Sequence, residues 1–125
     1  IWRVATEELG IGHDETTPDG KFSLERIECR AACTRAPVVT ANWEYLDDRT
    51  PASVREVIAR LREGEPVQAT RGPQIRTFRD TERTLAGFDD GLADAHSIDD
   101  KMLVGLKVAR ERGMSAPPPP EGGSH

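Results

Sequence analysis

The segment of residues 50–64 constrains the fold most, because its apolar residues recur with the period of an α-helix. Thr50 is a suitable N-cap, Pro51 suits the first helical position, and Gly64 is a typical residue just beyond a helix end. A helix with a single apolar stripe has to bury that stripe against another element. The stripe consists of Val54, Val57, Ile58 and Leu61.

The elements that could cover this stripe lie earlier in the chain. Residues 1–9 predict a second amphipathic helix, which Gly10 ends. Alternating or β-branched runs predict strands at residues 21–28, 37–41 and 43–46, the last two joined as a hairpin at Asn42. Residues 1–64 are therefore expected to form an α/β domain with the order helix, strand, strand, strand, helix.

Composition excludes several classes of protein. The chain has 125 residues, 17 Lys plus Arg and 22 Asp plus Glu, and a net charge of −5, which argues against binding nucleic acid through phosphate contacts. Unbroken apolar runs reach only three residues, so no direct membrane span is expected. Two cysteines cannot form a disulfide framework, which favours a soluble protein of a reducing compartment.

The chain changes character after Gly64. Residues 65–96 contain scattered apolar residues without a sustained period, and Ser97 is a candidate cap for a helix that ends before Gly113. We expect residues 65–113 to form an extension that becomes ordered against a partner. The Pro- and Gly-rich residues 114–125 are expected to be disordered.

The candidate site consists of two thiols four residues apart, Cys29 and Cys33. Thiolates are soft ligands that suit iron–sulfur clusters or zinc, and a loop between two cysteines can direct both sulfurs to one metal centre. Arg30 and Arg35 would help to offset the negative charge of a thiolate-ligated cluster. The spacing alone fits equally well with two small thiols that line a core.

Other polar residues offer weaker candidates. His13 is the only other conventional metal ligand near the cysteines, and its context predicts an ordinary loop residue. The acidic pairs Asp47-Asp48 and Asp89-Asp90 lie in polar, turn-like contexts, and we expect them to be solvated. General acid–base catalysis would need a partner group in a pocket, so no catalytic acid or base is expected.

The residues around the cysteines give the most specific signal. In their order along the chain they resemble the thioredoxin-like [2Fe-2S] ferredoxins, and within that family the branch found in bacterial NADH-quinone oxidoreductase (respiratory complex I). A weaker similarity to the C-terminal extension of some members lies at residues 71–73 and 83–88. The stronger matches are Thr17-Pro18-Asp19-Gly20-Lys21-Phe22-Ser23-Leu24-Glu25, Ile27-Glu28-Cys29, Ala32-Cys33, Ala36-Pro37-Val38-Val39, Asn42, Tyr45 and Thr50-Pro51.

The resemblance implies a thioredoxin-like [2Fe-2S] ferredoxin fold with a C-terminal extension. It implies that Cys29 and Cys33 bind the cluster as metal ligands, and that an earlier cysteine pair supplies the other two. That pair is absent from this sequence, so we expect the domain to be incomplete at its N-terminus. The family usually has a glycine between the two cysteines, where this chain has Arg30-Ala31-Ala32, and alanine would be strained in a left-handed conformation. A cation at Arg30 is expected to favour the reduced cluster and raise its potential.

The function implied by the resemblance is electron transfer within an NADH:quinone oxidoreductase. The cluster would lie near the FMN of a partner subunit that oxidises NADH, among other peripheral-arm subunits, on the cytoplasmic side of the inner membrane. The same module serves NAD-linked formate dehydrogenases and bidirectional hydrogenases. With one cysteine pair, a cluster-less thioredoxin-like interaction module and a dithiol redox protein are the alternatives from other classes.

Overall fold

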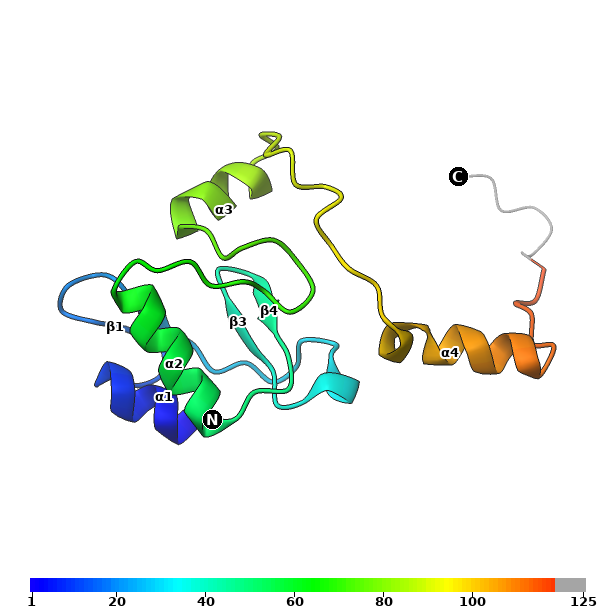
Figure 1. The fold of residues 1–125 in the computed structure, drawn as a ribbon, viewed down its shortest axis with the longest axis horizontal. Helices are drawn as coiled ribbons and strands as arrows, with labels where there is room; N and C mark the ends of the chain where they lie inside the picture. The colour runs from blue at the N-terminus through cyan, green and yellow to red at the C-terminus, as the bar shows by residue number, and fades with distance from the viewer. Residues whose placement is uncertain (119–125) are drawn as a thin grey trace.

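The computed structural model describes residues 1–118. Figure 1 shows two helices beside a small region of strands, followed by a long extension that ends in a separate helix. The elements are α1 (Trp2–Leu9), β1 (Glu15–Thr16), β2 (Ser23–Leu24), the 3₁₀ turn η1 (Cys33–Arg35), β3 (Val39–Ala41), β4 (Glu44–Leu46), α2 (Pro51–Arg62), α3 (Phe78–Leu85) and α4 (Asp100–Glu111).

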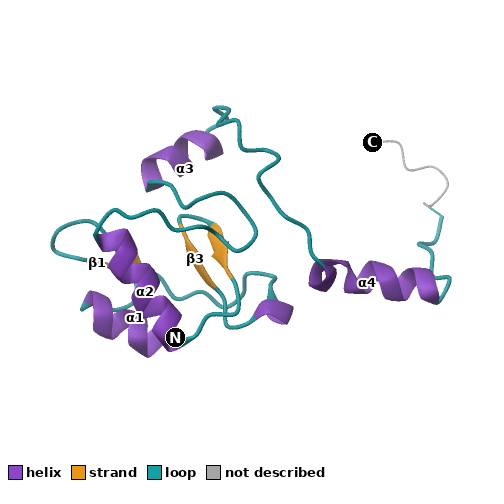
Figure 2. Cartoon of the chain, viewed as in Figure 1, coloured by secondary structure: helices purple, strands orange, loops and turns teal. Residues whose placement is uncertain are grey.

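The main apolar core lies between α1 and α2, which pack side by side (Figure 2). Both predicted helices are confirmed. Gly10 ends α1 in the left-handed conformation, and Thr50 caps α2 by accepting a hydrogen bond from the Ser53 amide. The buried core consists of Val4, Ala5, Val54 and Ile58, with Ile1, Leu9, Leu24 and Val39 packed against it.

The first pair of strands is shorter than predicted. Instead of a strand over residues 21–28, only Ser23–Leu24 is regular, and it pairs antiparallel with β1, which was not predicted from the sequence. Leu24 packs on the helical core, whereas the residues that follow it run as an irregular loop toward the cysteines. Cys29 therefore lies on irregular backbone and Cys33 at the start of η1, both outside the strands.

The second pair of strands confirms the predicted hairpin. β3 and β4 pair antiparallel, and the two residues between them, Asn42 and Trp43, have φ values of 48° and 74°. Positive φ at both positions is the geometry of a two-residue hairpin turn, so Trp43 belongs to the turn and not to the third predicted strand. The Ala36-Pro37 peptide bond that precedes this hairpin is cis.

The extension contains one helix that was not predicted from the sequence and a second helix that starts later than predicted. α3 was not predicted because its two apolar residues, Phe78 and Leu85, are too few to show a helical period. Both are exposed, and the buried residue of this helix is Thr81. α4 is capped by Asp99, whereas the predicted cap, Ser97, uses its amide to bind the Arg71 carbonyl. Residues 114–118 have no regular secondary structure, and the rest of the predicted disordered tail lies outside the described residues.

Candidate functional site

Cys29 and Cys33 lie on one exposed loop, and both thiols are free. Cys33 begins η1, while Cys29 precedes it on irregular backbone. Their exposure contradicts the alternative in which the two thiols line a core. The amide of Ala31 donates a hydrogen bond to Cys29 Sγ at 3.2 Å. Amide donors of this kind stabilise negative charge on a ligating sulfur, so the loop suits a thiolate.

The turn between the cysteines requires a left-handed residue. Ala31 has a φ of 51°, and this is the conformation in which alanine is strained and glycine is not. The strain is therefore located between the two cysteines, the segment in which the family usually has a glycine. The same left-handed residue, Ala31, donates its amide hydrogen to the Cys29 sulfur.

Replacing Ala31 with glycine should raise the free energy of unfolding by about 0.5–1 kcal/mol, because relief of left-handed strain exceeds the added entropy of the unfolded chain. Ala32→Gly is the control, since Ala32 has a φ of −128° and a buried methyl group. That control should destabilise the protein. Urea unfolding of both variants measures the difference, and equal effects would contradict strain at Ala31.

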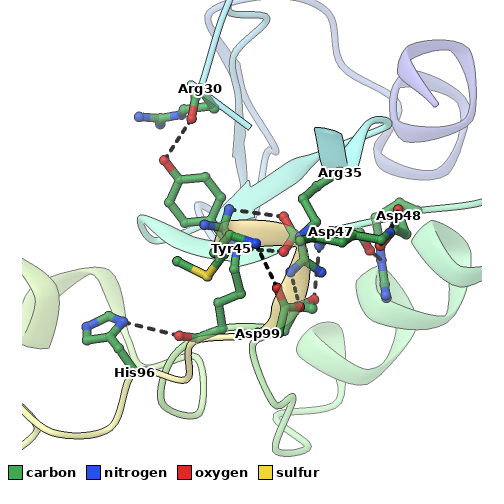
Figure 3. Close-up of polar contacts among 12 residues, drawn as sticks. Arg30, Arg35, Tyr45, Asp47, Asp48, His96 and Asp99 are labelled. Carbon is green, nitrogen blue, oxygen red and sulfur yellow. Dashed lines mark hydrogen bonds and ion pairs between the residues drawn. The ribbon is translucent and has the colours of Figure 1, made fainter. Parts of the chain in front are cut away.

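The Cys29 side of the loop is held by Tyr45 (Figure 3). The Tyr45 hydroxyl donates to the carbonyl of Arg30 at 3.0 Å. The Arg71 guanidinium lies 4.1 Å from the centre of the Tyr45 ring, which is cation–π geometry. Arg71, which lies in the extension, therefore supports Tyr45, the hairpin residue that contacts the loop between the cysteines.

The prediction that the Asp47-Asp48 pair is solvated is wrong for Asp47. The Asp47 side chain is 0% exposed and forms two contacts with Arg71, at 2.6 Å to Nε and 3.1 Å to the terminal nitrogen. The Asp47 amide donates a hydrogen bond to the Thr70 hydroxyl oxygen at 3.0 Å. Asp48 is half-exposed and pairs with Lys101. The acidic pair therefore links the hairpin end to the extension.

Arg30 stacks on the hairpin turn. Its guanidinium lies 4.6 Å from the centre of the Trp43 ring, and Trp43 is 52% exposed. This stacking holds the Arg30 guanidinium against the Trp43 ring. The expected effect of Arg30 on a cluster's potential stays a prediction.

His13 has a structural partner. Its Nδ1 accepts a hydrogen bond from the amide of Arg26, and its ring makes an edge contact with Trp2. Within residues 1–118, no group of three or more His, Cys, Asp or Glu side chains could hold a metal ion. The expectation that Cys29 and Cys33 bind a metal centre stays a prediction.

A separate cavity of about 370 Å³ lies between β4 and the extension. Burial raises the pKa of the Glu44 carboxyl, which lines the cavity, while the nearby His96 and Arg76 act in the opposite direction. Asp90 is not simply solvated as predicted. Its carboxylate pairs with Arg76 at 2.7 Å, and hydrogen bonds lower its pKa, first from the Leu92 amide. Oppositely charged side chains therefore line this cavity beside the hairpin.

Comparison with known families identifies the fold of the first half. The model of the family described as thioredoxin-like [2Fe-2S] ferredoxin matches residues 1–62. Residues 1–62 belong to this family. The predicted α/β ferredoxin fold is thereby confirmed, and the loop with Cys29 and Cys33 falls within the [2Fe-2S] ferredoxin domain.

Three relatives, each named as a subunit of NADH-quinone oxidoreductase, are informative. The protein from Mycobacterium tuberculosis is 49% identical over 116 residues, which cover 91% of this chain and 46% of the relative. The protein from Rickettsia bellii is 47% identical over 62 residues, or 50% of this chain and 37% of the relative. The protein from Thermus thermophilus is 42% identical over 69 residues, or 54% of this chain and 38% of the relative. The chain spans less than half the length of each of these relatives.

The relatives differ in how much of this ferredoxin they match. The mycobacterial match is long enough to include most of the extension, whereas the Rickettsia and Thermus matches cover about half of the chain. The extension contributes Arg71 and Asp99, whose roles at the cysteine loop were not predicted from the sequence. For Arg71 the only signal was the weak family similarity at residues 71–73, and that similarity does not include Asp99.

Proposed function

We propose that the chain is part of an electron-transfer subunit of an NADH-quinone oxidoreductase, in which it holds a [2Fe-2S] cluster near the FMN of a partner subunit. The observation that carries the proposal is the exposed loop of a [2Fe-2S] ferredoxin domain that presents two free thiols. An amide is already directed to one of the sulfurs. Exposed thiols on a turn are available to a metal centre, whereas thiols packed in a core are not.

Cys29 and Cys33 would supply two of the four ligands that a [2Fe-2S] cluster takes. The family resemblance implies that another cysteine pair would supply the other two ligands. The cluster, when bound, supplies one-electron transfer. Cys29 and Cys33 would bind it, the Ala31 amide donates to the Cys29 sulfur, and Tyr45 holds the loop through the Arg30 carbonyl. The subunit itself needs no catalytic acid or base.

The proposed partners are the subunit that binds NADH and FMN, together with other peripheral-arm subunits of respiratory complex I. The names of the mycobacterial, Rickettsia and Thermus relatives support this assignment. The complex would place the chain on the cytoplasmic side of the inner membrane as a peripheral component. In residues 1–118, none of the helices has the length and apolar character needed to cross a membrane.

The extension, residues 65–113, is proposed to contribute to an interface with those subunits, beyond a ferredoxin domain at residues 1–64. α4 supports this, because its apolar side chains remain exposed, as those of a helix do when it lacks a partner. Figure 1 shows α4 set apart from the rest of the chain. The exposed apolar residues of α4 are Met102, Leu103, Val104, Leu106 and Val108.

Iron and acid-labile sulfide analysis of the full-length protein, with an absorption spectrum, tests the proposal. We expect two irons and two sulfides per chain, and visible bands that bleach on reduction. A colourless full-length protein without iron would contradict the proposed function.

The alternative is a thioredoxin-like module without a cluster, either an interaction module or a dithiol redox protein. It is favoured by one observation, that residues 1–118 contain no group of three or more potential ligands. The same iron and sulfide measurement separates the two, because a module without a cluster has no iron and leaves Cys29 and Cys33 as titratable thiols. The equivalent subunits of NAD-linked formate dehydrogenases and hydrogenases would also carry the cluster, and the copurifying subunits distinguish them.

A further inference from the structure

The turn that presents Cys33 contains a buried cation. Arg35 is the last residue of η1, two residues after Cys33, and its side chain is only 8% exposed. Its guanidinium pairs with the carboxylate of Asp99, and its Nε has no partner in the described part of the chain. A buried guanidinium without an opposite charge is strongly destabilising. Asp99 is therefore the group that makes the burial of Arg35 tolerable.

Asp99 comes from the extension and has two roles. It is the N-cap of α4, where its carboxylate accepts a hydrogen bond from the Met102 amide at 3.2 Å. The same carboxylate pairs with Arg35, which is 64 residues earlier in the chain. The start of α4 is thereby fixed to the turn of Cys33, as Figure 3 shows for Arg35 and Asp99.

A second contact joins the same two segments. The amide of Asp48 donates to the carbonyl of Arg35 at 2.8 Å, and the Asp48 carboxylate lies 3.4 Å from Lys101 Nζ. Lys101 is in the first turn of α4. The beginning of α4 thus contacts the turn of Cys33 directly through Asp99, and indirectly through Lys101 and Asp48.

We propose that Asp99 is a positioning residue of the cluster site, which fixes the turn of Cys33 through Arg35 and neutralises that cation. The inference rests on the proposed function. A cation near a cluster favours its reduced, more negative state. The extension would therefore set the cluster's reduction potential through one ion pair, and a change in the position of α4 would alter that potential.

The test compares Asp99→Asn with Asp100→Asn in the full-length protein within its complex. Asparagine caps helices as well as aspartate, so Asp99→Asn keeps the cap and removes only the charge. Asp100 is the exposed neighbour in the first turn of α4, and its replacement changes the net charge equally. An EPR redox titration should show a higher midpoint potential for Asp99→Asn, no shift for Asp100→Asn, and the wild-type value for Asp99→Glu.

Equal midpoint potentials for Asp99→Asn and Asp100→Asn would overturn the inference while the proposed function stands. A wild-type protein without a cluster would instead overturn the proposed function, and this inference with it. If Asp99→Asn loses its cluster, the double variant Arg35→Met/Asp99→Asn decides the matter. It should regain the cluster because no uncompensated buried charge remains, and failure to regain it would overturn the inference.

Discussion

Replacing Arg71 with methionine should lower the free energy of unfolding by about 3–5 kcal/mol, because it leaves the Asp47 carboxylate buried without an opposite charge. The loss exceeds that of an ordinary surface ion pair, since the Asp47 side chain is fully buried. Urea unfolding of the full-length protein measures it. The midpoint should shift to lower urea with little change in slope.

Arg79→Met is the matched control for this variant. Arg79 is exposed on α3, so its replacement removes the same charge and should change stability by no more than about 0.5 kcal/mol. Adding Asp47→Asn to Arg71→Met should recover part of the lost stability, because the buried charge is then gone. If Arg71→Met and Arg79→Met unfold at the same urea concentration, the buried Asp47–Arg71 pair contributes no more to the free energy of unfolding than an exposed arginine does.

Replacing either Cys29 or Cys33 with serine should lower the iron and sulfide content of the full-length protein more than about tenfold. Loss of a group that merely supports a metal ligand already costs about 10–100-fold in affinity, and these substitutions remove the ligand itself. Serine keeps the size and polarity of the exposed loop, so the far-UV circular dichroism spectrum should change little. Iron analysis and the visible spectrum provide the measurement.

Thr34→Ala is the control for the cysteine variants, since Thr34 is exposed and adjacent to Cys33. It should retain the cluster. If the serine variants retain as much iron as Thr34→Ala, then the ligands lie elsewhere. If all the proteins, wild type included, are free of iron, the dithiol or cluster-less alternative is favoured.

The helical core could be predicted from the sequence because its determinants are local. Thr50, Pro51 and a stripe at helical spacing define α2, and Gly10 defines the end of α1. The hairpin was predictable from a β-branched run next to Asn42, although the left-handed Trp43 was not. α3 was missed because its cap, Thr77 with Asp80, is not followed by a buried apolar stripe.

The candidate site was also predictable only in part. Cys29 and Cys33 were found from residue type and family resemblance, both of which are read along the chain. The groups that support them were not, because the Asp47–Arg71 and Arg35–Asp99 pairs join residues 24 and 64 positions apart. Such pairs follow no sequence period, so Asp47 was expected to be solvated. Only the folded chain shows that it is buried.

The ion pairs that hold the extension differ in how strongly dissolved salt weakens them. The Asp47–Arg71 pair is largely shielded from water, whereas Asp48 and Lys101 are both about half-exposed. Mobile ions screen exposed pairs far more than buried ones. As ionic strength rises, the Asp48–Lys101 contact should weaken before the contact at Arg71. The start of α4 therefore has one attachment that depends on its ionic surroundings, beside the Arg35–Asp99 pair, whose guanidinium is buried.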